Sequence, residues 1–270
     1  MNREALEAIA RERIAAQDGR RAIETFSSRF PALSIDDAYE IAHIVHEHRL
    51  REGARPAGRK IGFTNPAMWA AYGVRQPIWG YMYDTTVHEL GEGAGAWSLA
   101  GFTQTKIEPE IVLHFREAPP AGDAADVLAC IDWIAHGFEI VQSPFPEWKF
   151  SAADAVAVAG LHAMLLVGKR MAVSDLGPGA AGALEAFRLT LSRNGERVAS
   201  GRGSDVLGSP LLAISHLVAA LREQPRRAPL EAGEIVTTGT ITLAQPVAAG
   251  DRWSTAIEGI GLDPIEAAFK

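Results

Sequence analysis

Two carboxylates stand two residues apart in an otherwise apolar segment, KIEPEIVLHF at residues 106–115. We expect this segment to be a β-strand, in which alternate side chains point to the same face. Glu108 and Glu110 would then lie side by side, with Lys106 as a neighbour on that face. Two like charges this close raise each other's pKa unless a cation neutralises them, and a divalent metal ion suits a site built from oxygen ligands.

A third acid, Glu139, lies in a second apolar segment, GFEIVQS, at residues 137–143. We expect a helix over residues 124–134 to connect the two strands and allow them to meet. Three carboxylates with water in the remaining positions suit Mg²⁺ or Mn²⁺ better than zinc, because His and Cys at zinc-ligand spacing are missing. The spacing of Glu108 and Glu110 alone instead favours a half-exposed strand whose acids face water.

Helical patterns come first along the chain, and short strand patterns follow. Ser34 and Asp37 form a capping-box pattern, which predicts the start of a helix. This order predicts an α+β protein, in which a helical N-terminal part, residues 1–57, packs on a mixed sheet domain, residues 58–270, in one compact unit. The expected strands lie in GRKIGF, in IWGYMY and at residues 104–115, 137–143, 162–168 and 186–193.

The overall composition excludes several classes of protein. The 270 residues are 47% hydrophobic and 22% charged, as in ordinary globular proteins, and the formal net charge of -7 argues against a nucleic-acid surface. The single cysteine excludes an internal disulfide and fits a reducing compartment. The most apolar stretch, residues 155–168, is shorter than the roughly 20 residues that cross a bilayer, and the N-terminus lacks a signal-peptide pattern. We therefore expect a cytoplasmic protein with no membrane or nucleic-acid partner.

Three histidines, His43, His46 and His48, lie on the helix that follows Ser34. Helical spacing brings His43 near His46, a pattern that some metal sites use. Because no further ligand accompanies them, we expect a solvated helix face instead.

Five longer motifs occur in order along the chain. They read GRKIGFTNPAMWAAYGVRQPIWGYMYD, KIEPEIVLHF, GFEIVQSPFPEWKFSAAD, VLGSPLLAISHLVAAL and LEAGEIVTTGTIT. From about Ile35 onward the chain resembles the 2-keto-4-pentenoate hydratase and 4-oxalocrotonate decarboxylase group of the fumarylacetoacetate hydrolase superfamily. The resemblance implies a mixed β-roll of the fumarylacetoacetate hydrolase C-terminal-domain type, packed with helices, and assembly into a homo-oligomer.

The resemblance also implies a site and a reaction. The metal, Mg²⁺ or Mn²⁺, would be bound by Glu108, Glu110 and Glu139. Lys60, in the KIG motif, would lie close to the substrate as a catalytic residue, with Thr64 and Asn65 beside it as substrate-binding residues. The implied substrate is a small unsaturated 2-oxo or 2-hydroxydienoic acid. The implied reaction is its hydration, most like that of 2-oxopent-4-enoate hydratase in the catabolism of aromatic ring-cleavage products.

The chain departs from that family at two places. It reads QPIWG where hydratases usually read QPDFG, so Ile78 takes the place of an acid in the substrate site. It also reads AVAVAGLH after Asp154, where polar residues are usual, and this introduces His162. His162 is a candidate catalytic proton carrier, since a free histidine has a pKa of about 6.5, but its apolar surroundings favour a histidine of the core.

Three other functions fit parts of the pattern. A 4-oxalocrotonate-type decarboxylase needs no water-activating acid, so Ile78 favours it. Hydrolysis of a C–C bond in an acylpyruvate needs a base, for which His162 is the candidate. A catalytically silent paralogue that binds a metal or a ligand also fits the altered segments, whereas the retained Lys60 and the three acids argue against it.

Overall fold

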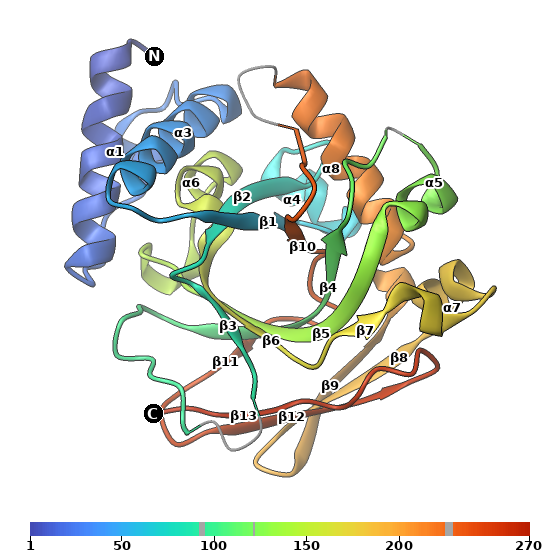
Figure 1. Cartoon of the computed structure of the whole chain (residues 1–270). Coiled ribbons are helices and arrows are strands. Elements are labelled where there is room, and N and C mark those ends of the chain that lie inside the picture. The colour runs from blue at the N-terminus through green and yellow to red at the C-terminus, as the bar shows by residue number, and fades with distance from the viewer. Residues whose placement is uncertain (92–94, 121, 225–228) are drawn as a thin grey trace.

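The N-terminal part of the chain is helical. Its helices in the computed structural model are α1 (Arg3–Asp18), α2 (Phe26–Arg29) and α3 (Ile35–Arg51). The structure describes residues 1–91, 95–120, 122–224 and 229–270, and Figure 1 shows α1 and α3 together at one side of the molecule. Ser34 and Asp37 form the predicted capping box at the start of α3, which satisfies backbone N–H groups that the helix leaves unpaired.

A curled mixed sheet forms the body of the protein (Figure 1). Its main strands among the described residues are, in spatial order, β2 (Ile78–Tyr83), β1 (Pro56–Gly62), β10 (Ile235–Thr237), β4 (Lys106–Phe115), β5 (Ile131–Val141), β6 (His162–Val167) and β3 (Val87–Glu89). The short strands β11 (Gln245–Pro246) and β7 (Met171–Ala172) pair with β4 and β5. Strands β1 and β10 are parallel, as are β3 and β6, while the other pairs are antiparallel. The predicted α+β class with a mixed β-roll is confirmed.

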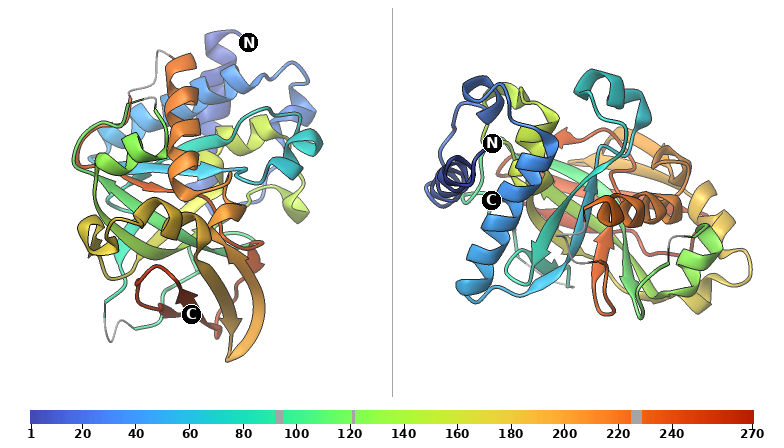
Figure 2. Two further views of the ribbon diagram at one scale, coloured as in Figure 1. Left: turned by 90° about the vertical axis from the view of Figure 1, so that its right-hand side faces the viewer. Right: turned by 90° about the horizontal axis from the view of Figure 1, so that it is seen from above.

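A second, antiparallel sheet lies below the first in Figure 1. In spatial order its strands are β13 (Glu266–Ala268), β12 (Arg252–Glu258), β8 (Arg188–Arg193) and β9 (Glu196–Arg202). The other α-helices are α4 (Trp69–Tyr72), α5 (Ala124–Ala129), α6 (Ala152–Ala157), α7 (Ala180–Ala186) and α8 (Pro210–Glu223). Short 3-10 turns are η1 (Pro66–Met68), η2 (Pro146–Trp148), η3 (Ala159–Leu161), η4 (Val173–Leu176) and η5 (Gly203–Asp205). Figure 2 shows α8 from two further directions, lying across the upper part of the roll.

The structure corrects the predicted connection between β4 and β5. The helix expected over residues 124–134 ends at Ala129, and β5 begins at Ile131, well before the strand expected at residues 137–143. The segment that follows α5 reads CIDWIA, and its β-branched and aromatic side chains suit a strand. Phe115 of β4 pairs with Ile131, so the sheet continues through a segment that the sequence pattern assigned to a helix.

The prediction of a solvated histidine face on α3 is wrong for one of its three members. His43 and His48 each pair with a glutamate one turn further along the helix. His46 instead turns toward β2, where its ring stacks on Tyr81 at 3.7 Å and its Nδ1 lies 3.0 Å from the Tyr83 hydroxyl. Burial lowers the pKa of His46 to about 4, so the ring is neutral at neutral pH.

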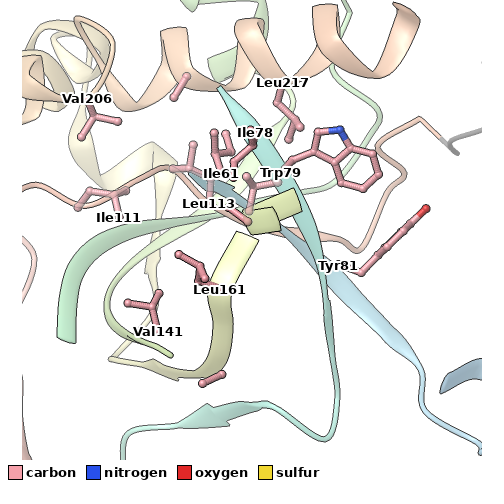
Figure 3. Close-up of a cluster of buried hydrophobic side chains, with 14 of the residues drawn as sticks. Ile61, Ile78, Trp79, Tyr81, Ile111, Leu113, Val141, Leu161, Val206 and Leu217 are labelled. Atoms are coloured by element: carbon pink, nitrogen blue, oxygen red, sulfur yellow. The ribbon is translucent and has the colours of Figure 1, made fainter. Parts of the chain in front are cut away.

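One apolar cluster joins the helices to the sheet. Figure 3 shows Ile61 of β1, Ile78 of β2 and Leu217 of α8 in this cluster. Leu6 of α1 belongs to the same cluster, so residues 1–57 share a hydrophobic core with the strands. This shared core fixes the helical part against the side of the roll that carries β1 and β2.

One described helical segment, Gly203–Glu223, is long and apolar enough to cross a membrane by length and composition. Within the molecule, 61% of its most apolar window is buried. Leu211, Ile214 and Leu217 are among its buried side chains, and Pro210 with the preceding Ser209 cap starts the regular helix. The apolar face of this segment is therefore used in the core of the protein.

Candidate metal centre

The three acids singled out in the sequence lie together on two neighbouring strands. Strands β4 and β5 pair antiparallel, and their register places Glu108 directly opposite Glu139. Glu110 follows two residues along β4 and therefore points to the same face as Glu108. A set of ligand oxygen atoms, one from each carboxylate, lies within 4.8 Å of one another. The period of the strand thus creates the close carboxylate pair that the sequence predicted.

These carboxylates lie inside the roll. Glu110 and Glu139 are fully buried, and Glu108 is half-buried. Lys106 forms no ion pair with these acids among the described residues. Its Nζ instead lies over the Trp148 ring, 3.9 Å from the ring centre. The alternative of a half-exposed strand with both acids in water is therefore wrong for Glu110.

The electrostatics of the three acids are unequal. Burial raises the pKa of Glu108 to about 7, although Lys60 opposes the shift. Burial and the charge of Glu139 raise the pKa of Glu110 well above its ordinary value. Burial also acts to raise the pKa of Glu139, but Lys60 and His162 outweigh it and bring this pKa to about 2. Of the three acids, only Glu139 therefore has its ionised form stabilised by neighbouring residues of the chain.

The donor set fits a divalent cation. One oxygen of Glu110, Oε1, is buried and accepts no hydrogen bond from any residue that the structure describes, whereas Oε2 accepts one from the Gly239 N–H at 2.8 Å. A buried carboxylate oxygen without a partner is costly unless a cation or a donor reaches it. Three carboxylates on two rigid strands are ligands that Mg²⁺ and Mn²⁺ accept. Glu108, Glu110 and Glu139 could hold such an ion.

Lys60 reaches this cluster from β1. Its Nζ donates a hydrogen bond to the Gly160 carbonyl at 3.0 Å and lies 3.4 Å from Glu139 Oε1. The side chain is 3% exposed. Burial acts to lower the pKa of Lys60, but the surrounding carboxylates, led by Glu139, raise it overall. The lysine is therefore an ammonium inside the roll, directly beside the candidate metal ligands.

His162 also contacts the cluster, at the first residue of β6. Its Nδ1 lies 2.8 Å from Glu139 Oε1, and its Nε2 lies 2.9 Å from the Thr86 hydroxyl. The expectation of an apolar core environment is therefore incomplete, because both ring nitrogens have polar partners. One ring nitrogen therefore contacts Glu139 while the other contacts Thr86. Thr86 fixes the orientation of the ring, and the ring in turn positions the carboxylate.

The three predicted substrate-binding residues have different surroundings. Thr64 is 5% exposed and lies against Gly239, the residue whose N–H binds Glu110. Asn65 is exposed, and its Oδ1 caps η1 by accepting a hydrogen bond from a backbone N–H at 3.0 Å. Ile78 is 3% exposed and lies against Gly62, close to the Lys60 amine. Thr64 and Ile78 therefore lie near the carboxylate cluster, while the Asn65 side chain serves the local turn.

Sequence reasoning missed several groups that hold the centre. Thr86 binds His162, the Gly160 carbonyl accepts from Lys60, and the Thr237 hydroxyl lies 3.4 Å from Glu139 Oε2. The TTGT segment that contains Thr237 could have been noticed, because hydroxyl and glycine residues at the end of an apolar strand often serve a site. Nothing in the local sequence marks Thr86 as a partner of His162, since the two are 76 residues apart.

The curled mixed sheet and its carboxylate cluster define a β-roll protein with a centre suited to a divalent metal ion. A family model described as fumarylacetoacetate (FAA) hydrolase C-terminal matches residues 79–262. The chain therefore belongs to the fumarylacetoacetate hydrolase family, and it is an enzyme of that family.

Individual relatives agree with this assignment. The chain is 33% identical to 2-hydroxyhexa-2,4-dienoate hydratase of Comamonas testosteroni, over 91% of either chain. It is 30% identical to 4-oxalocrotonate decarboxylase of Pseudomonas putida, over 97% of this chain and 96% of that one. Among solved structures it is similar to 4-oxalocrotonate decarboxylase from Pseudomonas putida G7, complexed with magnesium and adipate. That comparison has a TM-score of 0.90 and 28% identity and covers 100% of this chain and 99% of the other.

The substitution Glu110→Gln distinguishes the contribution of Glu110 to metal binding from its contribution to the stability of the metal-free fold. Without a divalent ion we expect it to be neutral or stabilising, because it removes a buried like charge while its amide oxygen still accepts from Gly239. With Mg²⁺ or Mn²⁺ at about 100 times Kd, the wild type should gain about 2.7 kcal/mol and the variant much less. Thermal unfolding after chelation and metal titration measures both effects. Glu196→Gln, at an exposed position of β9, is the control, and an equal gain in Glu110→Gln and the wild type would contradict the assignment.

The substitution Gly160→Ala tests the backbone that holds Lys60. A Cβ atom at this position would lie 2.8 Å from Lys60 Cδ, and the φ of +63° already strains any residue but glycine. Gly73 has a nearly identical φ of +64° with open space around it, and the Val74 N–H donates to the Trp69 carbonyl, as at a helix end closed by a left-handed residue, so Gly73→Ala measures the backbone cost alone. We expect Gly160→Ala to lower the free energy of unfolding by at least about 1 kcal/mol more than Gly73→Ala. Equal losses in chemical denaturation would show that Lys60 is not packed against Gly160.

Proposed function

We propose that this protein is a divalent-metal-dependent lyase that hydrates a small unsaturated 2-oxo or 2-hydroxydienoic acid, most like 2-oxopent-4-enoate hydratase. The observation that carries the proposal is the buried cluster of Glu108, Glu110 and Glu139 with the Lys60 ammonium beside it. The names of similar proteins support the same reaction class, since they include hydratases and decarboxylases of such acids.

The charge distribution suits an acid substrate. A divalent cation held by the three glutamates would supply positive charge that stabilises the negative charge developing on a 2-oxo acid. Lys60 adds a second, fixed positive charge in a buried site, where electrostatic interactions are stronger than in water. We propose that Lys60 acts as an ammonium, which orients the substrate carboxylate or delivers a proton. His162 and Thr237 hold Glu139 in place while this happens.

The remaining features of the proposed enzyme follow from the donor chemistry and the resemblance. Mg²⁺ or Mn²⁺ is the proposed cofactor, because all three candidate ligands are carboxylates. Thr64 and Ile78 would line the substrate site near Lys60. We also propose a cytoplasmic homo-oligomer whose partner is the small acid substrate, in the catabolism of aromatic ring-cleavage products.

Decarboxylation of a 4-oxalocrotonate-type acid is the second candidate. Ile78 favours it, because this apolar side chain occupies a position where hydratases usually have an acid and is 3% exposed in a hydrophobic cluster. Water addition needs a group that moves protons near the reacting carbon, whereas loss of carbon dioxide needs only stabilisation of the resulting charge.

One assay distinguishes the two reactions. We expect 2-hydroxypenta-2,4-dienoate to lose its ultraviolet absorbance when the enzyme and Mg²⁺ or Mn²⁺ are present, without release of carbon dioxide. Excess chelator should abolish this turnover, and Glu110→Gln should reduce it at least about a hundredfold, the scale of losing one main electrostatic contribution. Carbon dioxide release from 2-oxohex-3-enedioate, with the dienoate left intact, would favour the decarboxylase. Full turnover in chelator would contradict both candidates.

A further inference from the structure

A polar cavity lies next to the candidate metal centre, on the side of the molecule that carries the helical N-terminal part. It has a volume of about 300 Å³ and lies between α1, α3 and the loop that links β2 to β3. This volume is at the lower end of the range of about 300–1,000 Å³ that small-molecule sites occupy. The polar side chains that matter for its chemistry are Arg13, Gln17, Arg49, Tyr83, Thr86 and His162.

Arg13 is the central feature of this cavity. It is 9% exposed, and no residue that the structure describes accepts a hydrogen bond from its guanidinium or forms an ion pair with it. Burial lowers the pKa of Arg13 to about 10, with an added effect from Arg49 and opposing effects from Tyr83 and Asp18, so it stays charged at neutral pH. A buried charge that lacks a bound counter-charge is costly, and an anion in the cavity would remove this cost.

The acids near the cavity already have partners. Asp18 accepts a hydrogen bond from Arg49 at 3.0 Å, and Glu52, which lines the cavity, accepts one from the same guanidinium at 2.9 Å. A smaller hollow that shares Arg13 with the cavity is also lined by Arg20 and Arg21. The surroundings of Arg13 therefore carry an excess of positive charge.

We propose that this cavity is a binding site for a small carboxylate, distinct from the candidate metal centre. The planar fork of Arg13 can hold a carboxylate by two parallel hydrogen bonds, and the cavity leaves room for a chain of a few carbons. The two sites lie on different edges of the same histidine ring. His162 meets Glu139 through Nδ1, whereas its Nε2 meets Thr86, which lines the cavity.

Calorimetric titration of the full chain with succinate, in buffer that contains Mg²⁺, tests this site. Glu110→Gln weakens the metal centre and leaves the residues that line the cavity unchanged, so arginine variants made in this background assign the succinate binding that remains. We expect one equivalent to bind in the Glu110→Gln background. Adding Arg13→Met, which keeps the apolar stem, should weaken binding at least tenfold. Adding Arg11→Met, an exposed arginine of the same helix, should leave it unchanged.

Several outcomes would overturn the proposal. They are no succinate binding to Glu110→Gln, equal binding after Arg13→Met, or equal binding of the neutral succinamide. If Arg13→Met fails to fold, diffraction from wild-type crystals soaked in bromide gives an independent answer. An anomalous peak beside the Arg13 guanidinium is expected, and a cavity without such a peak would contradict the site.

Discussion

The antiparallel register of β4 and β5 is the constraint on which the site depends. It places Glu108 opposite Glu139 and puts Glu110 on the same buried face. A slip of one residue would move the side chains of a strand to its other face and disperse the cluster. Buried like charges are unfavourable, so a fold that forces three of them together must also supply cations. Lys60 supplies part of that positive charge, and a metal ion held between the three carboxylates would supply the rest.

The neighbouring elements position the cationic and hydrogen-bonding partners of these acids. Strand β1 brings in the Lys60 ammonium, and β6 brings in His162, whose Nδ1 lies 2.8 Å from Glu139 Oε1. The turn η3 between α6 and β6 presents the Gly160 carbonyl to Lys60 with three successive residues at positive φ, a conformation that costs about 1–3 kcal/mol for each residue other than glycine. Further out, α1 adds Arg13 behind His162. Basic groups therefore surround the acids in layers, which suits a protein that binds small anionic acids.

The sequence predicted the chemistry of the site better than the secondary structure and packing that position its residues. Alternation along a strand was enough to pair Glu108 with Glu110, and the capping pattern at Ser34 located the start of α3, because both depend on residues close in the chain. The end of α5 at Ala129 was missed, since pairing with β4 overrides the local helical pattern. The burial of His46 was missed for a similar reason, because it depends on the packing of α3 against β2. Both the end of α5 and the burial of His46 depend on contacts between segments that lie far apart in the sequence.

Anomalous diffraction from crystals of the wild-type protein grown with Mn²⁺ would show directly whether a metal ion lies between the three carboxylates. We expect a single strong manganese peak bounded by Glu108, Glu110 and Glu139, at roughly 2.0–2.3 Å from an oxygen of each carboxylate, a distance between those typical of Mg²⁺ and Ca²⁺. A fully loaded protein with no peak between these three side chains, or with its manganese bound elsewhere, would show that the three glutamates are not the metal ligands.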